Sequence, residues 1–415
     1  MFVSDEIREK AIDYEVESIH YITEQIGPRE SGMPKELEAE EWLKNELDNN
    51  GWADESTIDE FTVSRHALVG FTKVIGVILI VGCLLQLIFF AGRAASLIAA
   101  GIGLVFGVFC LLTTIEEFLL YHEFLDPFMP RTQSHNVYAK YSPQGEVKRR
   151  IIFNGHVDSA YEWTLMKIKQ NVMVGVLVID IICLLAMIVF TILGIIWPDI
   201  MWIRIVTAVL AIPFVGLFFV CNFKVVVPGA NDNLTGTLNA VAVLKCLKEA
   251  NIRFENTEVC ALLTGSEECG LRGAKAFAKK YKQECLEVPT AIICFDTLRD
   301  LEFLTIYDKD MTSLIKNDKD CSILLDKACE QINHKLIHGG VPFGSSDAAA
   351  LSRGGLKAIC VAGQDPLHAT YYHNTRDTAD NMRPECMRLC LDLSLAACEI
   401  FDKEGFGESS NANNE

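Results

Sequence analysis

Four long runs of apolar residues constrain the fold more than any other feature of this 415-residue chain. An α-helix needs about 20 apolar residues to cross the roughly 30 Å hydrocarbon core of a bilayer, whereas helices in globular proteins average only about 10–14 residues. The runs occupy residues 74–91, 94–115, 172–197 and 205–223. They predict four transmembrane helices. Asp180, the one charged residue within the runs, is expected to face another helix or water, because a charge is costly at that depth.

The turns between the first two runs and between the last two are short, so the runs form two hairpins, at residues 67–120 and 167–224. Each hairpin returns to its starting side, which places the polar remainder of the chain on one face of the membrane. Five basic residues flank the hairpins on that face: Arg65, Lys73, Lys167, Lys169 and Lys224. Only Arg93 and Arg204 lie at the far turns, where we expect them to be accessible. Because basic residues favour the cytoplasmic side, we predict a multi-pass protein of the cell membrane whose polar domain faces the cytoplasm.

The net charge of −18 argues against a nucleic-acid partner. Lys and Arg number 37 against 55 for Asp and Glu, and phosphate backbones are held by clustered Lys and Arg. The 15 cysteines, an odd number without a C-x-x-C pair, indicate free thiols in a reducing compartment rather than a disulfide framework. The N-terminus, MFVSDEIREK, lacks the basic start and apolar core of a signal peptide. These features agree with a cytoplasmic polar domain.

Outside the hairpins, short β-rich runs alternate with helical patterns. The β-rich runs lie at residues 150–154, 258–264, 290–295 and 357–361, and the helical patterns include residues 235–250, 271–281, 322–333 and 385–402. This alternation predicts an α/β fold with a mostly parallel central sheet covered by helices on both faces. The polar domain is expected to comprise residues 1–66, 121–166 and 225–404, interrupted by the hairpins and followed by a flexible tail at residues 405–415.

Residue types that bind metals follow the predicted strands. In such a sheet, functional residues gather beyond the carboxyl ends of the strands. The residues found there are His156, Asp158, Glu267, Glu268, Asp296 and His373, and Asp232 lies in a Gly-containing loop before a helix. Imidazole and carboxylate groups suit Zn²⁺, and a pair of four-coordinate ions needs roughly five or six protein ligands. Each residue alone says little, but His156, Asp232, Glu268, Asp296 and His373 together predict a two-metal site.

Several motifs occur along the chain in a fixed order. They are I-G-P-R at 26–29 with Gly32, H-x-D at 156–158, G-A-N-D-N-x-T-G at 229–236, E-E at 267–268, G-S-S-D at 344–347 and H-x-x-x-D-T at 373–378. In these motifs the chain resembles the co-catalytic dizinc aminopeptidases of the MH clan, relatives of the bacterial leucyl aminopeptidases. The resemblance covers nearly all of the polar domain. It implies that each chain binds two zinc ions, one through His156 and Asp296 and the other through Glu268 and His373, with Asp232 bridging both.

The same resemblance implies catalytic roles. Glu267 would be the general base, which takes a proton from metal-activated water and passes it to the leaving amine. Asp158 would hold the imidazole of His156. We expect Glu267 and Glu268 to point in different directions, because successive residues of an extended chain face opposite ways. The function implied is that of a membrane-anchored zinc aminopeptidase that removes N-terminal residues from peptides.

The chain departs from the family pattern in two places. In the family a short stretch separates H-x-D from the bridging Asp, whereas 76 positions separate His156 from Asp232 here, and the second hairpin fills the gap. A hairpin that returns to its starting face can be inserted without moving the ligands. It could form part of the substrate path or serve only as an anchor. Thr297, which follows Asp296, is the second departure, and the sequence assigns it no consequence.

Other functions remain open at this point. The chain lacks G-x-S-x-G, G-x-x-x-x-G-K-[ST] and H-E-x-x-H, so serine hydrolases, P-loop proteins and zincins have no support. The same residues could serve a carboxypeptidase, an N-acyl amino acid hydrolase or a glutaminyl cyclase-like enzyme. A non-catalytic receptor or scaffold on the same fold is a further alternative, but such a protein should have lost metal ligands or the general base. A transporter is weakened by having four spans and one intramembrane acid.

Overall fold

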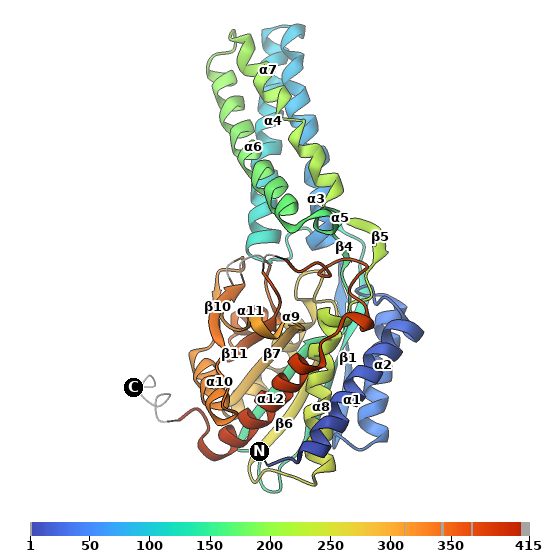
Figure 1. Cartoon of the computed structure of the whole chain (residues 1–415). Coiled ribbons are helices and arrows are strands. Elements are labelled where there is room, and N and C mark those ends of the chain that lie inside the picture. The colour runs from blue at the N-terminus through green and yellow to red at the C-terminus, as the bar shows by residue number, and fades with distance from the viewer. Residues whose placement is uncertain (1, 311, 342–343, 367, 408–415) are drawn as a thin grey trace, which may run out of the picture. The chain divides into compact units, whose positions relative to one another are not determined.

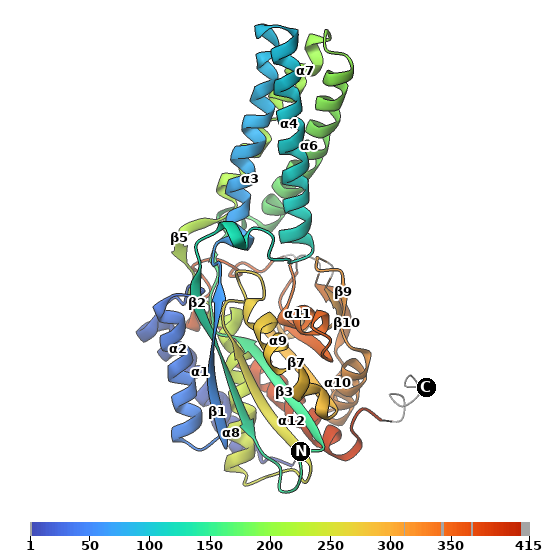
Figure 2. The same ribbon diagram turned by 180° about the vertical axis from the view of Figure 1, so that it is seen from behind.

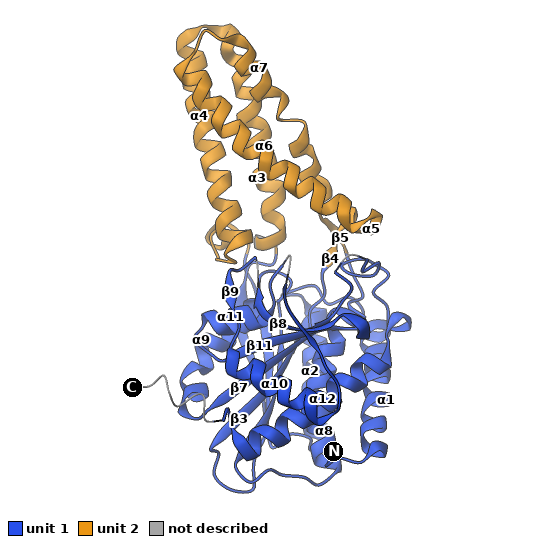
Figure 3. Cartoon of the chain, turned by 60° about the vertical axis from the view of Figure 1, so that its left-hand side comes forward, with its two compact units in different colours: residues 1–65, 131–160, 226–415 blue, residues 66–130, 161–225 orange. Residues whose placement is uncertain are grey.

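The computed structural model describes residues 2–310, 312–341, 344–366 and 368–407. Of the predicted tail, residues 408–415 lie outside the described residues. The chain divides into two compact units (Figure 3). Unit 1 comprises Met1–Arg65, Arg131–Ala160 and Val226–Glu415, and unit 2 comprises His66–Pro130 and Tyr161–Val225. The chain therefore leaves unit 1 twice and returns to it twice.

A nine-stranded sheet forms the centre of unit 1. Its strands follow the order β1 (Glu55–Val63), β2 (Thr132–Tyr141), β6 (Thr257–Thr264), β3 (Arg149–His156), β7 (Thr290–Leu298), β11 (Ala358–Gly363), β8 (Leu304–Asp310) and β10 (Ile337–Val341), with β9 (Ile315–Lys316) paired to β8. The central pairs β6–β3, β3–β7 and β7–β11 are parallel, as is β8–β10. Antiparallel pairs occur toward the edges, at β1–β2, β2–β6, β11–β8 and β8–β9.

Helices cover both faces of this sheet. On one face lie α1 (Asp5–Tyr21), α8 (Thr235–Glu249), α10 (Lys319–Gln331) and α12 (Pro384–Glu404), in front of the strands in Figure 1. On the other face lie α9 (Arg272–Glu287) and α11 (Asp347–Arg353), which Figure 2 brings forward. Helix α2 (Pro34–Asn49) packs against β1 and β2. The predicted α/β fold, with a mostly parallel sheet between helices, is confirmed.

The register of the central strands brings the site residues to one level. His156, the last residue of β3, lies opposite Thr264, the last residue of β6. On the other side of β3, Asn154 lies opposite Cys294 of β7, so that Asp296, two residues further along β7, is level with His156. Parallel strands end at the same edge of a sheet, and that edge carries the predicted metal ligands.

Unit 2 contains four helical segments long and apolar enough to cross a membrane: Leu68–Ala91, Arg93–Leu119, Gln170–Ile196 and Met201–Phe219. They comprise α3 (Ala67–Leu84), α4 (Arg93–Thr113), α6 (Gln170–Ile196) and α7 (Met201–Val209), with shorter 3-10 or π turns extending three of them. The last segment changes from α7 to a 3-10 turn that begins at Pro213. Near the ends of the second hairpin, α5 (Thr164–Ile168) follows β4 (Tyr161–Glu162), which pairs with β5 (Asn222–Val226).

Apolar side chains of unit 2 point both inward and outward. Leu79, Met187 and Phe214 are at most 1% exposed within the bundle, whereas Phe90, Ile98 and Ile212 are more than 60% exposed. Water disfavours large exposed apolar surfaces and lipid does not. Four such helices therefore indicate association with a membrane.

The buried charged side chains of unit 2 include Arg204 and Asp180, which lie in the helices of membrane-spanning length. Arg204 is 1% exposed, and its guanidinium donates to Gln86 Oε1 at 2.6 Å and to the Gly194 carbonyl at 2.6 Å. The prediction that Arg204 is accessible at the far turn is therefore wrong, because helix packing turns it into the bundle. Asp180 is 5% exposed and faces the Pro213–Phe219 segment at Gly216, in agreement with the prediction that it faces another helix.

The cysteines agree with the predicted free thiols, while the reducing compartment stays a prediction. All 15 are free, and all except Cys183 are buried. Burial raises the pKa of thiols in unit 1, among them Cys246 to about 12 and Cys285 to about 11, which keeps them protonated and unreactive.

Candidate functional site

The predicted metal ligands lie close together at the edge of the sheet. They come from β3 (His156), the loop before α8 (Asp232), the loop after β6 (Glu268), β7 (Asp296) and the loop after β11 (His373). His156 Nε2 lies 3.3 Å from Asp232 Oδ1, and His373 Nε2 lies 3.0 Å from Asp232 Oδ2. Each oxygen of one carboxylate thus faces a different imidazole. This is the arrangement that a carboxylate shared between two metal ions requires.

The remaining acidic residues complete two groups of donor atoms. One group contains His156, Asp232 and Glu268, and the other contains His156, Glu267 and Asp296, with donor atoms within 4.8 Å of one another in each. Glu268 Oε2 lies 3.4 Å from His373 Nε2, and Glu267 Oε2 lies 3.8 Å from His156 Nε2. The peptide bond between Asp232 and Asn233 is cis.

The chemistry of these donors fits divalent cations. Burial, followed by the charge of Asp232, raises the pKa of Asp296 to about 7. Burial alone would lower the pKa of His373, but the carboxylates of Glu268 and Asp232 outweigh it and raise the pKa to about 10. Glu268 Oε1 is buried without a hydrogen-bond partner among the described residues. Buried carboxylates that repel one another are stabilised by a bound cation, and imidazole with carboxylate suits zinc.

Asp158 supports two elements of the site. Its Oδ1 accepts a hydrogen bond from the Glu267 amide at 3.0 Å, and its Oδ2 accepts from the Glu268 amide at 3.1 Å and from Ser31 Oγ at 2.7 Å. The His156 Nδ1 atom lies 3.4 Å from Asp158 Oδ1 and 3.2 Å from the Asp158 carbonyl oxygen. Asp158 is therefore in contact with the imidazole that it was predicted to orient, and it also holds the loop of both glutamates.

That loop differs from the sequence-based expectation. Strand β6 ends at Thr264, and Ser266 has a φ of +55°, so Glu267 and Glu268 do not continue an extended strand. Their different directions follow from the loop, which Asp158 and Glu36 hold by its amides. Glu36 Oε1 accepts from the Ser266 amide at 2.7 Å and from Ser266 Oγ at 3.1 Å.

Sequence reasoning assigned no role to several residues that hold the site. Asp377 Oδ1 accepts from the Asn231 amide at 2.9 Å and the Asn231 side chain at 2.7 Å, and Asp377 Oδ2 accepts from the Asp232 amide at 3.1 Å. The Tyr372 ring stacks on the imidazole of His373, with ring centroids 3.9 Å apart. Asp377 and Tyr372 both lie in or beside the H-x-x-x-D-T motif, which was the available signal. Nothing in the sequence distinguished Glu36.

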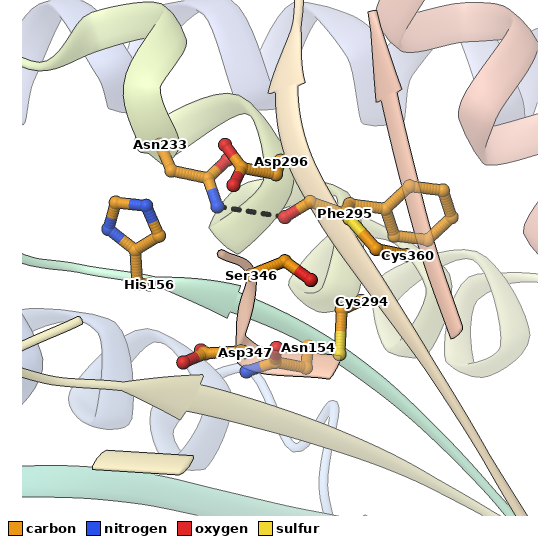
Figure 4. A pocket seen from close by; sticks show the side chains of 9 residues that line it. All are labelled: Asn154, His156, Asn233, Cys294, Phe295, Asp296, Ser346, Asp347 and Cys360. Atoms are coloured by element: carbon orange, nitrogen blue, oxygen red, sulfur yellow. Dashed lines mark hydrogen bonds between the residues drawn. The ribbon is translucent and has the colours of Figure 1, made fainter. Parts of the chain in front are cut away.

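A pocket is lined in part by Asp296, the residue before Thr297, at which the chain departs from the family pattern (Figure 4). Its lining residues are Asn154, His156, Asn233, Cys294, Phe295, Asp296, Ser346, Asp347 and Cys360. The Asn233 side chain donates to the Phe295 carbonyl at 2.8 Å, and its Oδ1 accepts from the Thr297 amide at 3.2 Å. Thr297 Oγ1 in turn donates to Asp296 Oδ1 at 2.9 Å. Thr297 therefore holds the carboxylate of Asp296.

Gly155 is required where β3 meets the start of α8. A Cβ atom at this position would lie 2.3 Å from the Thr237 amide nitrogen and 2.4 Å from the Gly236 carbonyl carbon. We expect Gly155→Ala to destabilise the protein by about 1–3 kcal/mol, because the backbone must move to admit the methyl group. The melting temperature of the full-length protein measures this effect.

Gly101→Ala is the matched control for this prediction. Apart from its own helical turn, no atom of the described residues lies within 4 Å of the Cβ position at Gly101 in α4, and Ala favours a helix over Gly by up to about 1 kcal/mol. The melting temperature of Gly101→Ala should be unchanged or higher. A wild-type melting temperature for Gly155→Ala would contradict the close approach.

Comparisons with known proteins find one matching family profile and several similar structures. The sequence profile of Peptidase family M28 matches residues 215–398, whereas no curated protein matches the chain. An aminopeptidase from Aneurinibacillus sp. strain AM-1 has a similar structure, with a TM-score of 0.54, 14% identity and 95% of each chain covered. A zinc aminopeptidase from Bacillus subtilis has a TM-score of 0.54 and 12% identity, covering 94% of this chain and 95% of its own.

A third similar structure has a different activity in its name. It is a glutaminyl cyclase from Fimbriiglobus ruber, with a TM-score of 0.55 and 14% identity, covering 94% of this chain and 95% of its own. At such identities these structures show a common fold. The matched segment 215–398 contains Asp232, Glu267, Glu268, Asp296 and His373. The resemblance to zinc aminopeptidases indicated by the motifs is thus confirmed: residues 215–398 match the profile of Peptidase family M28, and the chain shares its fold with zinc aminopeptidases.

Proposed function

We propose that the chain is a membrane-anchored zinc aminopeptidase that removes N-terminal residues from peptides. The family match and the aminopeptidase neighbours support a hydrolase that acts on peptides. The observation that carries the proposal is the Asp232 carboxylate, whose two oxygens each face one imidazole at 3.3 and 3.0 Å. Glu267 lies beside this pair, 3.8 Å from His156 Nε2.

Each of the site residues has a distinct proposed role. His156 and Asp296 would hold one zinc ion, Glu268 and His373 the other, and Asp232 would be shared. Bound zinc polarises the peptide carbonyl and acidifies water. Glu267 accepts the proton of the attacking water on a carboxylate oxygen and delivers it to the leaving amine. Asp158 keeps the Glu267 amide and the His156 imidazole in place through the contacts of its carboxylate.

A glutaminyl cyclase-like activity is the second candidate, because a protein of that name shares the fold. An N-acyl amino acid hydrolase could use the same donors. Purified full-length protein, loaded with zinc, separates the three. An aminopeptidase releases free amino acids from unblocked peptides, a cyclase releases ammonia from peptides with N-terminal Gln, and an acylase acts only on N-acylated amino acids. Activity confined to either of the last two substrate classes would replace the aminopeptidase proposal.

We also propose that unit 2 spans the cell membrane as two hairpins, with unit 1 in the cytoplasm. Five basic residues flank the ends at which the hairpins join unit 1, against Arg93 and Arg204 toward the far turns, and basic residues favour the cytoplasm. In intact cells, Arg93→Cys is expected to react with a membrane-impermeant thiol reagent, because the Arg93 side chain is 68% exposed.

Lys224→Cys is the matched control for this topology, since it should react only after the cells are permeabilised. A protease tag following Glu415 should likewise be cut only after permeabilisation. The opposite pattern, with Lys224→Cys labelled and Arg93→Cys protected in intact cells, would invert the topology.

A further inference from the structure

One short segment of unit 1 contacts residues next to all four points at which the chain leaves or rejoins that unit. This junction segment comprises residues 27–32. At the first insertion, Glu30 forms a 2.8 Å ion pair with Arg65, and the Gly32 carbonyl accepts from Thr132 Oγ1 at 2.8 Å. At the second insertion, the Arg29 amide donates to Ser159 Oγ at 2.9 Å, and the Arg29 side chain reaches Gly229. Unit 1 itself is interrupted after Arg65 and after Ala160.

The Arg29 side chain joins the two ends of the second insertion. It is fully buried, and its Nε donates to the Val157 carbonyl at 2.6 Å. Its two terminal nitrogens donate to the Pro228 and Gly229 carbonyls, both at 2.8 Å. A guanidinium presents its donors in a rigid, planar fork. Attachment at three carbonyls on two loops therefore fixes the distance between those loops.

Both loops carry residues of the candidate metal site. Val157 lies between His156 and Asp158, and Gly229 precedes Asp232 by three positions. The backbone approaches closely here, because a Cβ at Gly229 would lie 2.5 Å from Ser159 Cβ and 2.9 Å from Arg29 Nη2. Gly229 has a φ of +63°, which glycine adopts without strain. A further hydrogen bond, from the Val227 amide to the Ala160 carbonyl at 2.9 Å, closes the same base.

We propose that Arg29 is a positioning residue that closes the base of the second insertion and holds the loop of His156 at a fixed distance from the loop of Asp232. This inference rests on the proposed dizinc function. The cost of holding the ends of a chain together grows with its length, so a long insertion needs closure at its base in addition to the β4–β5 pairing within it. Arg29, which lies outside the insertion, supplies that closure from the body of unit 1.

The surroundings of the Arg29 guanidinium compensate for the burial of its charge. Burial lowers the pKa of Arg29 to about 10, while Asp158, Asp377 and Asp232 act in the opposite direction, so the guanidinium stays charged at neutral pH. A buried charge is tolerated when hydrogen bonds satisfy it, and backbone carbonyls provide them here. A neutral side chain of similar length would lose these bonds and leave carbonyls of both loops unpaired.

The test compares Arg29→Met and Arg29→Lys with Arg65→Met in the full-length protein. Arg65 contacts the same junction segment at the first insertion and does not carry a loop of the metal site. Zinc affinity, measured by competition with a chelator, is expected to fall about 10- to 100-fold in Arg29→Met, the range found when residues that orient metal ligands are removed. It should fall less in Arg29→Lys, which keeps the charge without the fork, and remain unchanged in Arg65→Met. Wild-type zinc affinity in Arg29→Met would overturn the inference.

Hydrogen exchange of the metal-free protein separates this inference from the proposed function. Amides of residues 229–233 should exchange faster in the Arg29 variants than in wild type or in Arg65→Met, while amides of the distant strand β8 stay protected. If the wild-type protein binds no zinc, the dizinc proposal is refuted, yet hydrogen exchange still tests whether Arg29 closes the base of the second insertion. Equal hydrogen exchange at residues 229–233 in all variants would refute the role of Arg29 and leave the dizinc proposal untouched. Arg29→Lys serves for both measurements if Arg29→Met does not fold.

Discussion

Glu267→Gln is expected to lower turnover about 10²- to 10⁴-fold, the usual contribution of general-base catalysis, while the protein keeps its zinc and its fold. The amide has the shape of the carboxylate but cannot accept the proton. The contact that holds Glu267 in place is made by its backbone amide to Asp158 Oδ1 at 3.0 Å, and the substitution leaves that contact intact. Steady-state kinetics and zinc content, measured on the same preparation, check both parts of the expectation.

Glu268→Gln is the matched control, one position along the chain. Its Oε2 lies 3.4 Å from His373 Nε2, in the donor set of one proposed ion. Because an amide is a poorer metal ligand than a carboxylate, this variant should lose zinc as well as activity. Wild-type turnover in Glu267→Gln would remove Glu267 from the mechanism, and loss of zinc in that variant would make it a ligand instead.

Asp232→Ala should have the second large effect, the loss of both zinc ions. Its two oxygens face His156 Nε2 and His373 Nε2, so one substitution removes a donor from each proposed ion. It also leaves the two imidazoles without the carboxylate between them. Zinc content after dialysis, measured by atomic emission, is expected to fall from two ions per chain to fewer than one.

Asp300→Asn provides the comparison for Asp232→Ala. Asp300 is about as buried as Asp232, with 4% against 3% exposure, and it accepts from Tyr371 Oη at 3.2 Å. It lies outside both groups of donor atoms, and its substitution should leave two ions bound. Two ions retained in Asp232→Ala would refute the bridging role.

The placement of the candidate ligands was predictable because it follows from chain direction. His156 ends a parallel strand, Glu268 lies just beyond one and Asp296 lies two residues before the end of another, and such ends share one edge of the sheet. No distance had to be known for that inference. The motif order supplied Asp232 and His373, which lie on loops whose course the strand pattern does not determine.

Contacts that depend on tertiary packing could not be predicted. Arg29 binds backbone carbonyls, which every residue has, so no partner type marks its sites in the sequence. Arg204 was predicted to be exposed because hydropathy along the sequence does not show which side of a helix faces its neighbours. Strand β1 reads E-S-T-I-D-E-F-T-V, and its many polar residues, typical of an edge strand, hide it from a search for apolar runs.

The position of β3 in the sheet also affects how the protein can be made. Its neighbours, β6 and β7, both follow the second insertion, and β7 ends 142 residues after His156, at Leu298. At about 5–20 residues per second, a ribosome needs roughly 7–30 s to cover that distance. Ile151, Ile152 and Phe153 of β3, all fully buried in the finished sheet, lack a neighbouring strand on at least one side during this time. We therefore expect a nascent chain at this stage to need chaperones that keep β3 from aggregating.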